Sequence, residues 1–127
     1  VEPREQVGDG EAVHRLLASA MPAAHRRFLA RLARHHRIGD VVFAHAGVRP
    51  GVPLQEQDPH DLVWIREGFL DHPSPLGFHV VHGHTPVDAP DERGSRTNVD
   101  TGAVYGGGLT AAVLEGETMR FLTVPAG

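Results

Sequence analysis

Histidines at the ends of two apolar segments are the residues of this sequence that point most clearly to chemistry. The first segment, residues 41–48, carries His45, and the second, residues 78–86, carries His82 and His84. Each segment reads as a buried strand that ends in a glycine-containing turn. A strand end holds a side chain rigidly, and imidazole nitrogen is a good ligand for Mn, Fe, Zn or Ni. A metal site is therefore the first hypothesis, although each histidine taken alone fits a core residue bonded to backbone equally well.

Two such histidines make only part of a hydrolytic metal centre, which needs three or more protein ligands and an open position for water. Asp100, in a glycine-bounded turn, and Asp88 are the candidate carboxylate partners. Residues two apart on a strand share a face. His82 and His84 could therefore be two ligands, a ligand and an acid–base group, or a ligand and a residue behind it, and the spacing leaves these alternatives open.

Arg66 and Tyr105 are candidates for contact with a substrate. Arg66 lies in a mostly apolar stretch, where burial of its charge is costly unless the charge is paired. It could pair with Glu67, or its planar guanidinium could hold a phosphate through two hydrogen bonds. Tyr105, the only tyrosine, could pack or could offer its hydroxyl to a substrate. The glycine run 106–108 predicts a tight turn rather than a phosphate loop, because the chain has no lysine.

The elements that must position these residues are predicted from periodicity and turn signals. Residues 1–10 read as an irregular lead-in, in which Asp9 could cap the next helix, and residues 87–95 read as a polar loop. Trp64, the only tryptophan, is expected to pack in the core. The order of elements predicts an α/β (α+β) fold with a mixed sheet. The expected helices cover residues 11–20, 22–36 and 60–70, and the expected strands cover residues 41–44, 78–86 with its turn, 96–101, 109–114 and 118–124.

Composition excludes several classes of protein. The 127-residue chain has a net charge of −4 and no basic patch, which argues against nucleic acid as a partner. It has no cysteine, so neither a disulfide scaffold nor a thiolate metal site is possible. No apolar run approaches the roughly 20 residues that span a membrane, and no signal-peptide pattern opens the sequence. We therefore expect a cytoplasmic protein with no membrane partner.

Four sequence blocks stand out along the chain: FAHAGVRPG (residues 43–51), LVWIRE (62–67), VHGHTP (81–86) and VDTGAVYGGGLT (99–110). In this order and spacing, they resemble the C-terminal half of bacterial serine/threonine protein phosphatases of the calcineurin-like metallophosphoesterase superfamily. The resemblance covers roughly residues 22–114. It implies that residues 1–127 form a single partial domain, the C-terminal half of a metallophosphoesterase-type β-sandwich flanked by helices, with a mixed sheet.

The resemblance also implies a reaction and a division of roles. Two divalent metal ions, usually Mn with Fe, Zn or Mg as alternatives, would activate the water that hydrolyses a phosphate monoester. His45 and His84 would bind the second ion, Arg66 would hold the phosphate oxygens, and Tyr105 would lie near the substrate. The implied substrate is a phosphoprotein or phosphopeptide at phosphoserine or phosphothreonine. The alternatives are a nucleotide or diadenosine-polyphosphate hydrolase of the same superfamily, and a catalytically inactive binding relic.

The sequence departs from this family in its first half. Family members carry three upstream blocks, G-D-x-H-G, G-D-x-x-D-R-G and G-N-H-E, and none of them occurs here. Those blocks supply the ligands of the first metal, the bridging aspartate and the histidine that protonates the leaving group. His82 matches no ligand of the family, so we expect it, with Asp100, behind the ligands. We further expect that the N-terminal half is missing in cis, and that the isolated chain has little or no activity.

Overall fold

The computed structural model of the chain describes residues 10–126, which form two compact units that divide after Ala33. The predicted capping role of Asp9 and nearly all of the predicted lead-in lie outside the described residues. Gly10, the last residue of that lead-in, already begins the first helix. The single partial domain predicted over residues 1–127 stays a prediction.

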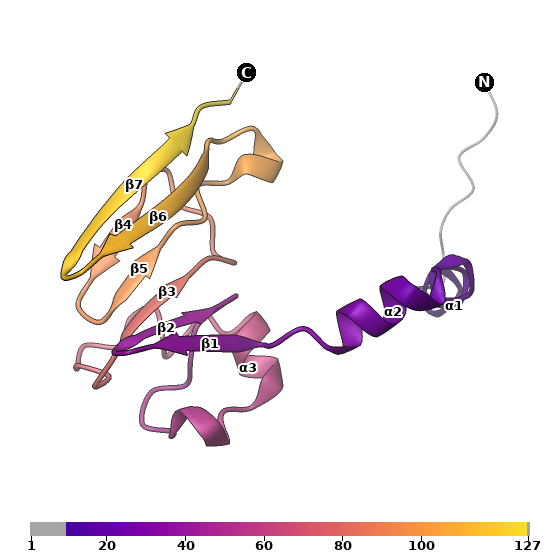
Figure 1. Ribbon diagram of the computed structural model, residues 1–127, viewed down its shortest axis with the longest axis horizontal. Helices are drawn as coiled ribbons and strands as arrows, with labels where there is room; N and C mark the ends of the chain where they lie inside the picture. The colour runs from indigo at the N-terminus through magenta and orange to yellow at the C-terminus, as the bar shows by residue number, and fades with distance from the viewer. Residues whose placement is uncertain (1–9, 127) are drawn as a thin grey trace. The chain divides into compact units, whose positions relative to one another are not determined.

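The first unit contains two helices, α1 (Gly10–Ala20) and α2 (Ala23–Ala30), separated by a break at Pro22 (Figure 1). Proline has a fixed φ and no backbone N–H, so it interrupts one helix and suits the start of the next. The first predicted helix is confirmed. The second was predicted to reach residue 36 and is shorter, because residues 35–36 instead pair with a strand of the second unit.

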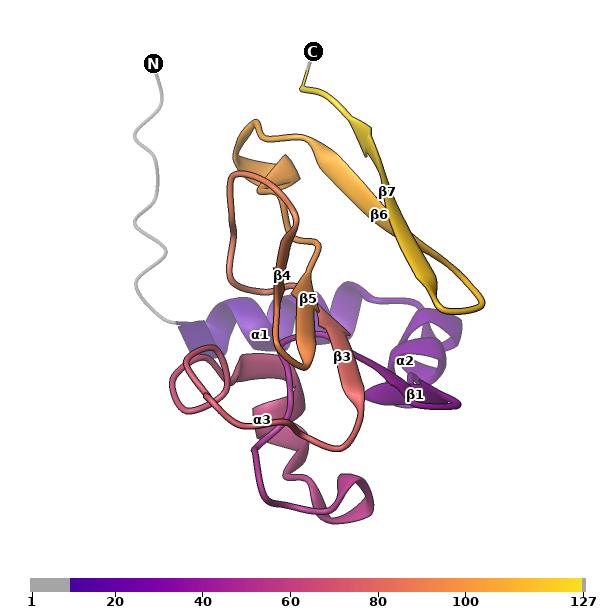
Figure 2. The ribbon, with the colours of Figure 1, turned by 90° about the vertical axis from the view of Figure 1, so that its left-hand side faces the viewer.

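The second unit contains a five-stranded sheet in the spatial order β1–β2–β3–β5–β4, whose strands are all labelled in Figure 1 and which Figure 2 shows from another side. β2, β3 and β5 run parallel, whereas β1 and β4 pair antiparallel at the two edges. This mixed sheet, together with the helices, confirms the predicted α/β fold class. The strands are β1 (His35–Ile38), β2 (Val41–Ala44), β3 (His79–His82), β4 (Asp91–Arg93) and β5 (Arg96–Asn98).

The edge strand β4 lies in the stretch 87–95 that was predicted to be a loop, and this part of the prediction is wrong. β4 forms a hairpin with β5 around Gly94, which adopts φ 54. Its residues are charged, and Arg93 donates to Asp91 at 2.8 Å. Charged side chains are common on edge strands, where they discourage pairing with other chains. The strand therefore lacks the alternation of apolar and polar residues that would have marked it.

A separate two-stranded sheet, β6 (Leu109–Glu115) and β7 (Thr118–Val124), follows in sequence. The two strands pair antiparallel along their whole length, with Gly116 at φ 62 in the connection. This confirms the predicted hairpin. Several of its apolar side chains stay exposed, notably Leu109, Leu122 and Val124. An isolated two-stranded sheet is marginally stable in water, so these strands need further cover.

The core of the second unit lies against the middle of the five-stranded sheet. Val42 and Val80, on neighbouring strands, are fully buried and pack with Leu62, Ile65 and Phe69. Burial of such side chains is the main favourable term in folding. The cluster is completed by Ala46 and Val48.

The helix α3 (Pro59–Trp64) delivers part of this core and is shorter than the predicted helix 60–70. Its start is as predicted, since Asp58 accepts a hydrogen bond from the backbone N–H of His60 and Pro59 occupies the first turn. The helix ends because Ile65 adopts an extended conformation with ψ 140. Trp64 is 61% exposed, so the expectation that it packs in the core is wrong.

The loop after β2 is held rigidly beside α3. Arg49 forms a two-point ion pair with Asp61, with nitrogen–oxygen distances of 2.6 and 2.8 Å. The buried amide of Gln57 accepts from the backbone N–H of Arg49 and donates to the carbonyls of Arg49 and Val52. These contacts close the loop around backbone groups that would otherwise be unpaired. They fix the segment that follows His45.

No helix within residues 10–126 is long and apolar enough to cross a membrane.

Candidate metal and phosphate site

His45 and His84 lie side by side at one end of two neighbouring parallel strands. Phe43 of β2 pairs with Val81 of β3 in parallel, so the segments that follow the two strands leave the sheet at the same end. The backbone N–H of Gly83 donates to the carbonyl of His45 at 2.9 Å and ties the two turns together. The imidazole centroids are 5.1 Å apart, with an angle of 59° between the rings. The structure thus brings the two predicted ligands together.

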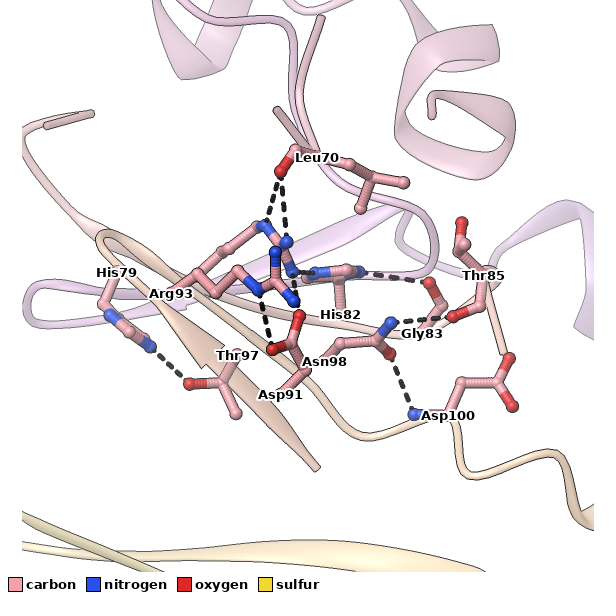
Figure 3. A network of polar contacts seen from close by, with 11 residues as sticks. Leu70, His79, His82, Gly83, Thr85, Asp91, Arg93, Thr97, Asn98 and Asp100 are labelled. Atoms are coloured by element: carbon pink, nitrogen blue, oxygen red, sulfur yellow. Dashed lines mark hydrogen bonds and ion pairs between the residues drawn. The ribbon is translucent and has the colours of Figure 1, made fainter. Parts of the chain in front are cut away.

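The turn that carries His84 is strained and strongly supported. His84 is the only residue other than glycine with positive φ, at 69°, among the described residues. Such a conformation persists where surrounding contacts impose it. The Asn98 side chain donates to the carbonyl of Thr85 at 2.7 Å and accepts from the N–H of Asp100 at 3.0 Å (Figure 3). Asn98, 1% exposed, thereby links the His84 turn to the Asp100 turn.

The surroundings of His84 favour a neutral imidazole. Partial burial lowers its pKa, and the positive charge of Arg66 lowers it further, while a hydrogen bond to the backbone of Trp64 opposes these effects. A neutral ring has one nitrogen that donates and one that carries a free lone pair. The bond to Trp64 occupies the donating nitrogen and leaves the other for an ion, which is the usual arrangement of metal-binding histidines.

The two rings fit one metal ion but do not complete its site. Two imidazoles bound to one ion at roughly 2.0–2.1 Å have centroids about 5 Å apart, close to the observed 5.1 Å. Within residues 10–126, no group of three or more histidine or carboxylate side chains lies together as a metal site. The described residues would therefore supply two of the three or more protein ligands that a catalytic ion requires.

His82 lies behind this pair, in a buried polar network (Figure 3). Its Nδ1 contacts the carbonyl of Gly83 at 3.1 Å, and its Nε2 lies 3.4 Å from Arg96. Arg96 can only donate, so Nε2 accepts and Nδ1 carries the proton. Both nitrogens are thus occupied within the protein, which favours the position behind the ligands over a ligand role. Arg96 also donates to the carbonyl of Leu70 and lies 3.3 Å from Asp91.

The burial of His82 should make the stability of the chain depend on pH. Burial lowers the pKa of His82 from 6.5 to about 4. The unfolded chain therefore takes up a proton that the folded chain does not, and stability present above pH 6.5 is lost as the pH falls through about 4. This shift in the pKa of His82 corresponds to a loss of about 3 kcal/mol in the free energy of unfolding. Urea unfolding of the metal-free chain across this range should show the loss.

The matched variant for this prediction is His82→Gln, which keeps a polar side chain and cannot titrate. Its free energy of unfolding should fall less steeply with decreasing pH than that of the unmodified chain. Equal slopes for the two proteins would contradict the role given to His82.

Asp100 lies in the same pocket as the histidines. The pocket measures about 420 Å³, and His45, His82, His84 and Asp100 are among its lining residues. One carboxylate oxygen of Asp100 accepts from the N–H of Gly102 at 3.1 Å, and the carboxylate raises the pKa of His84. A Cβ at Gly83 would lie 3.3 Å from the Cβ of Asp100, so the two turns approach closely at this position. Asp100 can thus act on the ligands electrostatically.

Arg66 and Tyr105 occupy different places. Arg66 is exposed and points toward the His84 turn, with Nη2 3.5 Å from the carbonyl of His84. Within the described residues it forms no ion pair with Glu67. Tyr105, 81% exposed, lines a second pocket with Asp88 rather than the pocket of the histidines.

Three residues of the site were not identified from the sequence. Asn98 and Arg96 sit in the short strand β5 and support His84 and His82 from behind. Two polar residues inside a predicted strand were the available signal, since buried polar groups usually have partners. The third residue is Trp64, whose ring lies edge-on to that of His84, with ring centroids 5.4 Å apart and an angle of 87° between the planes. Nothing in the sequence indicated this contact.

Comparison with known proteins finds relatives that are tetraphosphatases. The chain is 47% identical over 47 residues to the asymmetrical bis(5'-nucleosyl)-tetraphosphatase PrpE of Geobacillus thermodenitrificans, and equally so to that of Bacillus thuringiensis. It is 45% identical over 47 residues to the same enzyme of Anoxybacillus flavithermus. Each match covers 37% of this chain and 18% of the relative. No protein-family profile matches the chain.

A solved structure shares the fold over most of the chain. It is the crystal structure of a protein provisionally described as a diadenosine tetraphosphatase, with a TM-score of 0.65 and 25% sequence identity. The match covers 89% of this chain and 60% of that one. The predicted fold class therefore has a structural counterpart, of which this chain spans somewhat more than half.

Proposed function

We propose that this chain forms part of a metal-dependent hydrolase that acts on the phosphate groups of a dinucleoside polyphosphate. The observation that carries the proposal is the convergence of the His45 and His84 rings at the ends of two parallel strands. The relatives are named tetraphosphatases of bis-nucleosyl compounds, which supports this substrate class. The serine/threonine protein phosphatase predicted from the sequence remains the competing proposal.

The residues present suit the handling of a phosphate near a divalent ion. Bound ions at such a site supply water activation and neutralise the charge that develops on phosphate oxygens. His45 and His84 would hold one ion, with His84 fixed by its bond to Trp64. Arg66 is exposed beside His84, and its guanidinium can donate two parallel hydrogen bonds to a phosphate. The Asp100 carboxylate would offset part of the positive charge.

We expect the remaining ligands to come from outside residues 10–126, because no group of three histidine or carboxylate side chains lies together as a metal site within them. A single ion with two neutral ligands is weakly held, since its charge is poorly compensated. We therefore expect the isolated chain to hydrolyse phosphate esters slowly or not at all.

The test is a comparison of substrates with the complete gene product, including any residues encoded before Val1. Diadenosine tetraphosphate, a phosphothreonine peptide and p-nitrophenyl phosphate would be assayed with added Mn²⁺ and after chelation. We expect Mn²⁺-dependent cleavage, with kcat/KM for diadenosine tetraphosphate at least about tenfold higher than for the peptide, a difference of about 1.4 kcal/mol. The opposite order would support the protein phosphatase. If none of the three substrates is hydrolysed in a metal-dependent way, the alternative of a catalytically inactive binding protein would be supported instead.

A further inference from the structure

Trp64 is a large aromatic side chain in an unusual position, exposed beside the candidate site. It is the only tryptophan of the chain, and 61% of it is exposed. Tryptophan is on average among the more buried residues, so an exposed indole calls for a physical reason. The ring lies edge-on to His84, with centroids 5.4 Å apart, and alongside His60, with centroids 6.3 Å apart and planes 23° from parallel.

The backbone on both sides of Trp64 is anchored in the core. Leu62 and Ile65 are 3% and 6% exposed, and the N–H of Ile65 donates to the carbonyl of Asp61 at 3.0 Å. The Trp64 backbone also bonds the His84 side chain. A ring carried on such a fixed backbone loses little conformational freedom when a planar ligand stacks on it.

We propose that Trp64 is the stacking platform for the nucleobase of a nucleotide whose phosphate is held by Arg66 and the ion at His45 and His84, an inference that rests on the proposed function. Trp64 and Arg66 flank the same residue, His84, on its ring and on its carbonyl. A nucleotide whose phosphate sits at Arg66 therefore has its base within reach of the indole. Every nucleobase has a π-face that stacks on an aromatic side chain.

The chemistry around the ring favours a base over an apolar side chain of a peptide. His60 lies alongside the indole and carries ring nitrogens, while His84 and Arg66 border it on the side of the candidate ion and phosphate. An apolar peptide side chain would instead require an apolar groove. A heteroaromatic base combines a stacking face with polar edges that such neighbours can satisfy.

The single tryptophan makes binding directly observable in the 127-residue chain, because all indole emission comes from Trp64. The emission would be titrated with adenosine 5'-monophosphate, with ribose 5-phosphate and with inorganic phosphate, each with and without Mn²⁺. We expect saturable quenching by the adenosine nucleotide and much less effect of the two ligands that lack a base. Equal effects of the three ligands, or none, would overturn the proposal.

Variants extend the test to a signal that does not depend on indole emission. In equilibrium dialysis, Trp64→Ala should weaken adenosine 5'-monophosphate binding about 5- to 100-fold, while Trp64→Phe should keep most of the affinity. Phe28→Ala, which removes another exposed aromatic ring, is the control and should bind normally. Equal affinities for the Ala variant and the unmodified chain would overturn the proposal.

The two proposals can fail separately. If the nucleotide quenches Trp64 but the complete protein cleaves no phosphate ester, the platform stands and the proposed hydrolase falls. If the complete protein cleaves diadenosine tetraphosphate and Trp64→Ala leaves its KM unchanged, the hydrolase stands and the platform falls.

Discussion

Replacing His84 by alanine will weaken the binding of a divalent ion to this chain by at least about tenfold. Removing a residue that only hydrogen-bonds to a metal ligand already lowers metal affinity about 10–100-fold, and His84 would be a ligand itself. His84 and His45 face each other with ring centroids 5.1 Å apart, so either substitution removes half of a two-point attachment. Zn²⁺ is the better probe for the isolated chain, since imidazole sites bind it more tightly than Mn²⁺. Isothermal titration would give the affinity.

A double-mutant cycle sharpens this prediction. If one ion bridges the rings, His45→Ala, His84→Ala and the double variant should lose similar amounts of affinity, because either single change already breaks the shared site. His72→Ala removes an exposed histidine from the loop after α3 and should leave the affinity unchanged. Losses that add in the double variant would show that the two histidines bind separate ions. In the complete protein, the same variants should lose Mn²⁺-dependent hydrolysis.

Replacing Gly47 by alanine will strongly destabilise the second unit. A Cβ at Gly47 would lie 2.3 Å from two carbons of the Phe69 ring, and Gly47 also has φ +146. Phe69 cannot move aside easily, since it is 1% exposed and packs edge-on against His82. Overpacking and backbone strain together should cost at least about 3 kcal/mol, a large part of the stability of a small domain.

Thermal unfolding, followed by circular dichroism, measures this loss. Gly51→Ala is the matched control, because Gly51 lies in the same loop with φ +77 and has open space around it, so only the backbone cost of about 1–2 kcal/mol applies. Adding Phe69→Leu to Gly47→Ala should recover part of the loss by removing the ring. If Gly47→Ala melts like Gly51→Ala, the contact with Phe69 does not govern this position.

The parts of the fold that the sequence predicted well are those whose signals are local. Pro22 separates the two helices, Asp58 and Pro59 begin α3, and the β6–β7 hairpin turns at Gly116. Each of these depends on the conformational preference of one or two residues. The sequence placed His45 and His84 at strand ends for the same reason.

The parts that sequence reasoning missed are imposed by distant contacts. Residues 35–36 belong to a strand because they pair with β2, and nothing in their own pattern shows it. α3 ends at Trp64 because Ile65 adopts an extended conformation, and the helical spacing of Leu62, Ile65 and Phe69 gave no sign of this end. Tertiary packing of this kind routinely overrides local propensity.

The candidate site shows the same division. The two-residue rule for strands put His82 and His84 on one face, but His84 lies beyond the end of β3 in a left-handed conformation. His82 is therefore held by Arg96 while His84 turns to His45. A rule of strand geometry cannot predict where the strand ends, and that end decides which histidine reaches the pocket.

The parallel pairing of β2 with β3 has a consequence for the kinetics of folding. Val41 pairs with His79, far along the chain, whereas the β1–β2 and β6–β7 hairpins close locally. Hairpins form in about 1–10 μs, and non-local pairing is slower because loop-closure entropy opposes it. His45 and His84 therefore meet only after the slow step. An ion that binds both rings should leave the folding rate unchanged and slow unfolding, because it stabilises a contact absent from the transition state.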